Sequence, residues 1–266
     1  MKDLLKADLF KVRKSKIFLI FLIISVALPF IFAFGSYLIN VIYMSYQKRQ
    51  GYELYAIITG DTLIFSSVGV LQSFGIAIPI CADIIIYSDT RSGILRNKVI
   101  YGVNRYKIYL SNLIIAILLN IVFITLYFLS TILFSSIFLP FGLDINGEFF
   151  LKLLISLVNG VYSFTLTACL TCFFIYLFNN IVPTIILKIV IMFGIEIIYP
   201  IALFIPHSNA IYLIPYIANY DLSITLASAV SGDYVSSFLL GGASCIVIGA
   251  LLTLFGILIL RKRDIK

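Results

Sequence analysis

The chain has 266 residues, of which 62% are hydrophobic and only 12% are charged. This composition excludes a single domain folded in water and is typical of an integral membrane protein. The net charge is +7. We assign it to membrane topology and not to nucleic-acid binding, because no soluble domain is available to present a basic surface to phosphates.

Six membrane-spanning helices are predicted, because a span needs roughly 20 apolar residues and the charges divide the chain into six such runs. We therefore expect an all-α membrane protein with one transmembrane domain. The first apolar run is too long for a secretory signal and no small-residue cleavage site follows it, so it should remain as a span. The predicted spans are residues 17–39, 62–87, 108–139, 149–178, 184–205 and 235–260.

The distribution of cations predicts that both termini are cytoplasmic in a multi-pass protein of the cell membrane. Cytoplasmic loops are enriched in lysine and arginine, and the loops on the opposite side hold only Lys48 and Arg49. Fifteen cations lie on the predicted cytoplasmic side: Lys2, Lys6, Lys11, Arg13, Lys14, Lys16, Arg91, Arg96, Lys98, Arg105, Lys107, Arg261, Lys262, Arg263 and Lys266.

Residues 1–16 are predicted to form an interfacial helix before the first span. Asp8 falls inside its apolar face and Phe10 falls outside it, so a disordered basic tail is the alternative. After the span, which contains Pro29 and should bend there, residues 40–61 are expected to form an outer loop. Four tyrosines of this loop suit the headgroup level: Tyr43, Tyr46, Tyr52 and Tyr55.

A basic stretch, residues 89–111, follows the second span and reads DTRSGILRNKVIYGVNRYKIYLS. Gly93 and Gly102 should end a short one-sided apolar helix that contains Ile94, Leu95, Val99 and Ile100. We expect the region 88–107 to contact a partner outside the membrane, and a solvated loop that only sets topology is the alternative. The candidate contact residues are Asp89, Arg91, Gly93, Arg96, Lys98, Gly102, Arg105 and Lys107.

Asp83, Lys188 and Glu196 lie inside predicted spans, where each needs a counter-charge, a hydrogen bond or water. Asp83 and Lys188 lie at similar depths near the inner boundary, which predicts that they pair; separate snorkelling of each side chain is the alternative. Glu196 lies near the middle of the fifth span. It is expected either to be neutral and hydrogen-bonded or to line a wet path.

Small residues predict close helix packing in two later spans. The stripe in the fourth span could pack within the chain or form a dimer seam. Between the fifth and sixth spans, residues 206–234 are too apolar for a free loop and should re-enter the membrane as a broken helical segment. His207 is expected at its outer boundary. The small residues are Ser156, Gly160, Ser163 and Thr167 in the fourth span, and Gly241, Gly242, Gly249 and Gly256 in the sixth.

No catalytic or cofactor-binding motif is predicted. The phosphate-binding pattern G-x-x-x-x-G-K-[ST] is absent from the sequence, so any ATP and Mg²⁺ would be used by a partner subunit and the chain itself is not expected to be an enzyme. Cys169 and Cys172 lie on an apolar helix with no second cysteine pair and no nearby histidine, which does not predict a metal site.

Several features together resemble the membrane subunits of ABC-2 type exporters. These are the interfacial helix before the first span, the six spans, S-G-I-L-R-N and G-V-N-R-Y-K-I-Y-L-S after the second span, and the semi-apolar outer segment. The resemblance covers the whole chain. It is closest to the small permeases that accompany lantibiotic and peptide-antibiotic immunity ATPases in Gram-positive bacteria.

The resemblance implies a half-transporter that exports an amphipathic or peptide-like substrate. A second permease subunit, either the same chain or a relative, would pair with it, and two cytosolic ATPases would bind beneath. The basic stretch would be the coupling helix, and its Arg96, Lys98 and Arg105 would contact the ATPase. Residues 1–16 would be the elbow helix. The second and fifth spans would line the central transport path. The outer segment would act as a lid. The chain departs from the family in having almost no polar loop between the fourth and fifth spans, so a second coupling contact is not expected there.

A stand-alone secondary transporter or channel is the alternative from another functional class. Asp83, Lys188 and Glu196 would then be its coupling charges. The sequence shows no inverted repeat, since the basic stretch after the second span has no counterpart after the fourth. That absence argues against the alternative.

Overall fold

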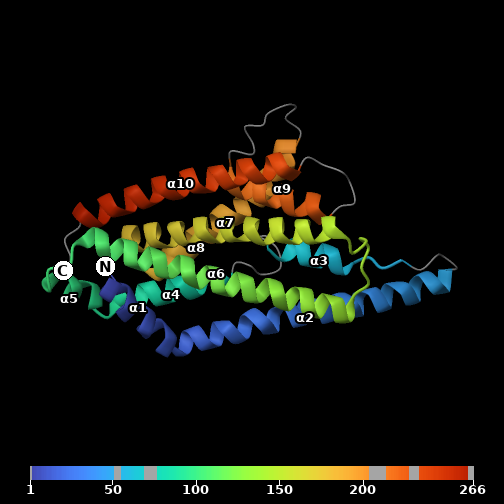
Figure 1. Cartoon of the computed structure of the whole chain (residues 1–266), viewed down its shortest axis with the longest axis horizontal. Coiled ribbons are helices and arrows are strands. Elements are labelled where there is room, and N and C mark those ends of the chain that lie inside the picture. Colours follow the sequence, from blue (N-terminus) through green and yellow to red (C-terminus); the bar gives the residue numbers. More distant parts are fainter. Residues whose placement is uncertain (1, 51–54, 69–76, 204–213, 228–233, 263–266) are drawn as a thin grey trace.

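The computed structural model describes residues 2–50, 55–68, 77–203, 214–227 and 234–262, and the regular structure in these ranges is α-helical (Figure 1). The helices are α1 Lys2–Lys14, α2 Lys16–Gln50, α3 Gly60–Ser67, α4 Ala77–Arg91, α5 Ile94–Ile100, α6 Arg105–Phe138, α7 Gly147–Phe178, α8 Ile181–Leu203, α9 Pro215–Ala227 and α10 Tyr234–Lys262.

Among the described helices, four are long and apolar enough to cross a membrane: α2, α6, α7 and the part of α10 from Ser237 to Lys262. Each contains or nearly matches a predicted span, because each is a long apolar run bounded by charges or turn residues. α8 overlaps the predicted fifth span and includes a shorter apolar stretch, Ile181–Gly194. The chain is therefore an all-helical multi-pass membrane protein, and a total of six spans stays a prediction.

Within the predicted second span, residues 62–87, the structure describes two helices, α3 and α4. α3 ends at Ser67 and α4 begins at Ala77, and residues 69–76 between them lie outside the described part. α3 has 8 residues and α4 has 15 in the described part of the chain, so a single crossing helix over residues 62–87 stays a prediction.

The prediction that residues 40–61 form a loop is wrong for its first part, because α2 continues to Gln50. Two buried amides attach the returning chain to this extension. Asn40 accepts hydrogen bonds from the N–H groups of Ile57 and Ile58, both at 3.1 Å, and Gln47 accepts one from the N–H of Tyr55 at 2.9 Å. These tertiary contacts give the side-chain amides of Asn40 and Gln47 hydrogen-bond partners. Without partners, these polar side chains would favour a loop.

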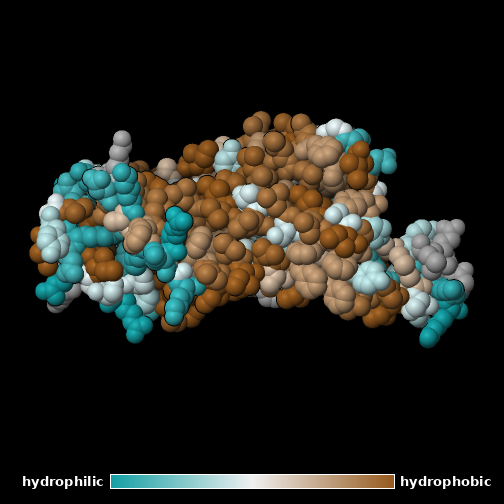
Figure 2. All heavy atoms as spheres, turned by 60° about the horizontal axis from the view of Figure 1, so that its bottom comes forward, coloured by the Kyte–Doolittle hydropathy of each residue, from teal (hydrophilic) through white to brown (hydrophobic). Residues whose placement is uncertain are grey.

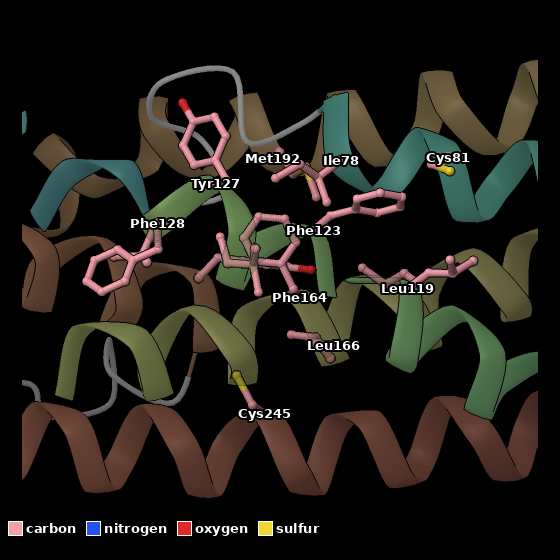
Figure 3. Close-up of a cluster of buried hydrophobic side chains, with 14 of the residues drawn as sticks. Ile78, Cys81, Leu119, Phe123, Tyr127, Phe128, Phe164, Leu166, Met192 and Cys245 are labelled. Carbon is pink, nitrogen blue, oxygen red and sulfur yellow. The ribbon is translucent and has the colours of Figure 1, made fainter. Parts of the chain in front are cut away.

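The largest hydrophobic core lies around α7, which contacts α4, α6, α8, α9 and α10. Leu119, Phe123 and Tyr127 recur every four residues and so share one face of α6. This face meets Phe164 of α7 and Met192 of α8 (Figure 3). The long apolar helices thus pack large apolar side chains together, and α7 occupies the middle of the bundle.

The small-residue stripe of the fourth span packs within the chain, and all four of its members are buried on α7. A Cβ atom on Gly160 would lie only 3.0 Å from Val68 Cγ1. On α10, a Cβ atom on Gly256 would overlap the hydroxyl group of Tyr109. The close packing predicted for both helices is confirmed, and the stripe favours intramolecular packing over a dimer seam.

The outer segment predicted at residues 206–234 contains α9, whose Ile217, Ala218 and Leu222 have no solvent exposure. α9 contacts α3, α7, α8 and α10. Its backbone is therefore covered by protein, as a re-entrant segment requires. Whether it re-enters the membrane stays a prediction, and His207 lies outside the described residues.

On the face shown in Figure 2, apolar side chains cover the middle of the bundle and hydrophilic residues collect at its two ends. On α8, for example, Val182, Ile186, Val190 and Phe193 are all exposed, as expected for a lipid-facing stripe. α1, α5, the start of α6 and the last turn of α10 lie together at one end, which we call the basic end (Figure 1). This arrangement agrees with the placement of most cations on one side.

Candidate functional site

α5 is a seven-residue helix at the basic end, in the middle of the stretch for which a partner contact was predicted. Gly93 before it and Gly102 after it have φ angles of 71° and 80°. Residues with a side chain rarely adopt this conformation. The two glycines therefore end the helix as the sequence predicted.

The inner side of α5 is held by charged side chains from two other helices, α1 and α4. Lys98 Nζ donates to Asp8 Oδ1 of α1 at 2.8 Å and to Asp89 Oδ2 of α4 at 3.4 Å. Lys11 of α1 forms an ion pair with the same Asp89, and Ser111 of α6 donates to Asp8 Oδ2 at 2.8 Å. We call Asp8, Lys11, Asp89 and Lys98 the α1 clamp, because together they fasten α1 to α4 and α5.

The clamp explains why Asp8 stands in the apolar face of α1. That face packs on the protein, with Leu4, Leu5 and Val12 beside the carboxylate, and Asp8 is buried there. The clamp also places two lysines close together. Burial and then the charge of Lys98 lower the pKa of Lys11, against an opposing effect of Asp8.

The outer side of α5 carries exposed residues of mixed character. Arg96 and Asn97 are exposed, and Ile100 and Tyr101 keep 68% and 86% of their surface accessible. Ile100 was predicted to share the apolar face with Leu95, which is wrong, because Leu95 is buried and Ile100 faces outward. Exposed apolar side chains between cations at a hydrophilic end of a protein favour a binding surface.

Arg105 and Lys107 lie in the first turn of α6, beyond Gly102. Arg105 Nη1 donates to the carbonyl oxygens of Leu260 at 3.3 Å and Arg261 at 2.9 Å. The arginine thus satisfies the carbonyls at the C-terminal end of α10. Lys107 lies with its ammonium 5.9 Å from the ring centre of Tyr106, while Arg91 is exposed at the end of α4.

A second charged site lies inside the bundle, where α4, α7 and α8 meet. Lys188 Nζ donates to Asp83 Oδ1 at 2.6 Å and to Thr171 Oγ1 at 2.9 Å. Only 4% of the lysine side chain and none of the aspartate side chain is accessible. The pairing predicted from their depths is confirmed, whereas a role in a transport path stays a prediction.

α4 connects the two charged sites. Asp83 and Asp89 lie six residues apart on this helix, which corresponds to about 9 Å along its axis. The first binds Lys188 of α8 and the second binds Lys98 of α5. Glu196 belongs to α8, but its side chain is not among those described, so its surroundings stay a prediction.

A family model described as "ABC-2 family transporter protein" matches residues 4–195. The chain belongs to this ABC-2 transporter family. The matched residues run from α1 into α8 and so include the α1 clamp, α5 and the Asp83–Lys188 pair. This ABC-2 protein is a membrane subunit and not itself the catalytic one, and the family implies that an ATPase pairs with it. A search of curated proteins found no match.

Four residues of these sites were missed from the sequence: Thr171, Ser111, Lys11 and Asp8. Thr171 and Ser111 are ordinary polar residues in long spans, where a single hydroxyl can also bind its own helix, so no pattern marks them. Lys11 is one of many basic residues in α1. Asp8 did carry a signal, since a carboxylate in an apolar helix face indicates a partner on the surface against which that face packs.

Proposed function

We propose that this ABC-2 protein is the permease subunit of an exporter and that the outer side of α5 binds a separate cytosolic ATPase. One observation carries this proposal. α5 is fixed on its inner side by Leu95 and Lys98, while Arg96, Ile100 and Tyr101 are exposed on a helix that glycines delimit at both ends. A docking helix needs both a rigid support and an uncovered surface.

The positive-inside rule supports the orientation that this function requires. Both ends of the described chain, α1 and the last turn of α10, lie at the basic end with α5. With the termini in the cytoplasm, α5 would face the compartment that contains ATP. Lys98 and Arg105 bind within the chain, so in this proposal Arg96 supplies the main charged ATPase contact and the other two position the region.

α4 would transmit movement from α5 to the interior. A shift of α5 pulls on Asp89 through Lys98, and the same rigid helix holds Lys188 through Asp83. Because α4 and α8 correspond to spans that line the path in the family resemblance, their relative movement would open or close it. This is a chain of physical contacts that mutation of either ion pair would interrupt.

The substrate proposed is an amphipathic or peptide-like compound, such as a lantibiotic, and Glu196 offers a test. A carboxylate near mid-membrane costs on the order of 3 kcal/mol on insertion scales unless it is paired or wet. In a pair of permease subunits, the two Glu196 carboxylates would favour passage of a cationic peptide. Glu196→Gln keeps the shape and removes the charge, so it should lower resistance of cells to cationic peptides while leaving resistance to a neutral analogue unchanged. Equal protection by the parent and the variant would refute the acidic path.

The function itself is tested with the complete transporter. The chain is co-expressed with the ATPase encoded by a neighbouring gene, purified, and reconstituted in lipid. We expect co-purification and ATP hydrolysis that the transported peptide stimulates. If the chain purifies alone and transports a substrate along an ion gradient without ATP, it is a secondary transporter and the exporter proposal fails.

A further inference from the structure

A cavity lies at the basic end between the first turn of α6 and the last turns of α10. It has a volume of about 630 Å³ and is lined by Asn104, Arg105, Tyr106, Ile257 and Arg261. The two arginines are 156 residues apart in the sequence, and the fold brings them to one cavity. The cavity belongs neither to the outer side of α5 nor to the Asp83–Lys188 pair.

Arg105 is held in a fixed position in this cavity. Its Nη1 binds the carbonyl oxygens of Leu260 and Arg261. A guanidinium has five N–H donors in a planar fork that matches the oxygens of a phosphate. These two bonds orient the guanidinium group before any ligand arrives.

A second cavity of about 360 Å³ adjoins the first at Asn104, which lines both. Its other lining residues include Leu4, Val103 and Lys107. Arg105 and Arg261 line the first cavity and Lys107 lines the second, and no acid is among the described residues that line either one. Such an arrangement favours an anion.

The neighbouring surface of α10 identifies the source of that anion. Leu251, Leu254 and Leu258 are exposed along one stripe of the helix, and Arg261 continues this stripe one turn further, about 4.5 Å along the axis. The stripe would face acyl chains in the bilayer. A phosphate that reaches Arg261 beside such a surface is best supplied by a phospholipid.

We propose that the two cavities bind the phosphodiester headgroup of an anionic phospholipid from the leaflet at the basic end. Arg261 and Lys107 contact the phosphate oxygens, Arg105 orients the site, and the acyl chains lie along Leu254 and Leu258. The lipid thereby joins the start of α6 to the end of α10. This site does not depend on the proposed ATPase contact, and either proposal can fail without the other.

Native mass spectrometry of the full chain in detergent, titrated with phosphatidylglycerol or phosphatidylcholine, tests the site. Arg261→Gln removes one charged contact while the backbone carbonyl that binds Arg105 remains. We expect it to weaken binding of phosphatidylglycerol at least about tenfold, the loss of one charge-assisted contact. Lys107→Gln should act in the same direction.

The matched control is Lys262→Gln, which removes the same charge from an exposed neighbour that lines neither cavity. It should change the affinity by less than about twofold, because salt screens an exposed charge. Equal losses for Arg261→Gln and Lys262→Gln, or equal binding of phosphatidylcholine, would overturn the site. Inorganic phosphate in competition separates the two sources: displacement of the lipid at comparable concentrations would assign the site to free phosphate and refute the lipid.

Discussion

The α1 clamp and the Asp83–Lys188 pair join helices with the same chemistry in different surroundings. Both use carboxylates and lysines, and α4 contributes an aspartate to each. In the clamp, 38% of the Lys11 side chain and 13% of the Lys98 side chain are accessible. In the bundle interior, Lys188 keeps 4% and Asp83 none.

This difference indicates which pair can rearrange. Charges near water exchange partners at little cost, since solvent replaces a lost contact. The clamp also holds two lysines near each other and shares Asp89 between them. A buried pair has no substitute partner, and its separation leaves an uncompensated charge. The clamp suits a support for α5 close to water, and the interior pair suits a fixed connection between α4 and α8.

The largest effect is expected from breaking the interior pair. Lys188→Met should lower stability by about 3–5 kcal/mol, because it leaves Asp83 buried and unpaired. The measurement is thermal unfolding of the purified chain in detergent. Combining Asp83→Asn with Lys188→Met removes both charges and should recover most of this loss. If the double variant is no more stable than Lys188→Met, the ion pair between Asp83 and Lys188 does not account for the stability lost in the single variant.

A smaller effect is expected from the clamp. Asp8→Asn weakens the bonds to Lys98 and Ser111 and should cost about 1.5–3 kcal/mol, the range for hydrogen bonds to a charged group. Asp3→Asn, an exposed acid of the same helix, is the matched control and should have no measurable effect. If both variants melt at the same temperature, α1 is not fastened by Asp8.

The smallest effect on stability is expected from an exposed ion pair on α7. Glu148 and Lys152 form an ion pair at 3.2 Å one turn apart on α7, and 60% of the glutamate side chain is accessible. Glu148→Gln should therefore cost only about 0.3–0.5 kcal/mol, and less in high salt. A loss as large as that of Asp8→Asn would mean that accessibility does not rank these pairs.

The sequence predicted best what depends on local patterns. Long apolar runs located α6, α7 and α10 within a few residues, and Gly93 and Gly102 marked the ends of α5. The pairing of Asp83 with Lys188 was predicted because burial forces two charges at one depth to find each other.

Contacts distant in the chain were harder to predict. The extension of α2 depends on Asn40 binding residues 57 and 58 of the returning chain. Lys98 was expected on a partner, but it binds Asp8, 90 residues away. Neither contact follows from a periodic pattern, because the pattern records which face is apolar and not what covers it.

The two sides of α5 provide the most direct test of the account, because its central claim gives them different tasks. We measure binding of the partner ATPase to the purified chain, together with its melting temperature, for the parent, Arg96→Glu, Lys98→Gln and Arg49→Glu. Arg49 is exposed at the far end of α2 and is the charge-matched control. Arg96→Glu should weaken ATPase binding at least about tenfold, as expected for a reversed charge in an interface, without changing the melting temperature. Lys98→Gln should act mainly by lowering the melting temperature. Arg49→Glu should change neither the melting temperature nor the binding of the ATPase. Binding of the ATPase to Arg96→Glu with the affinity of the parent would contradict the account.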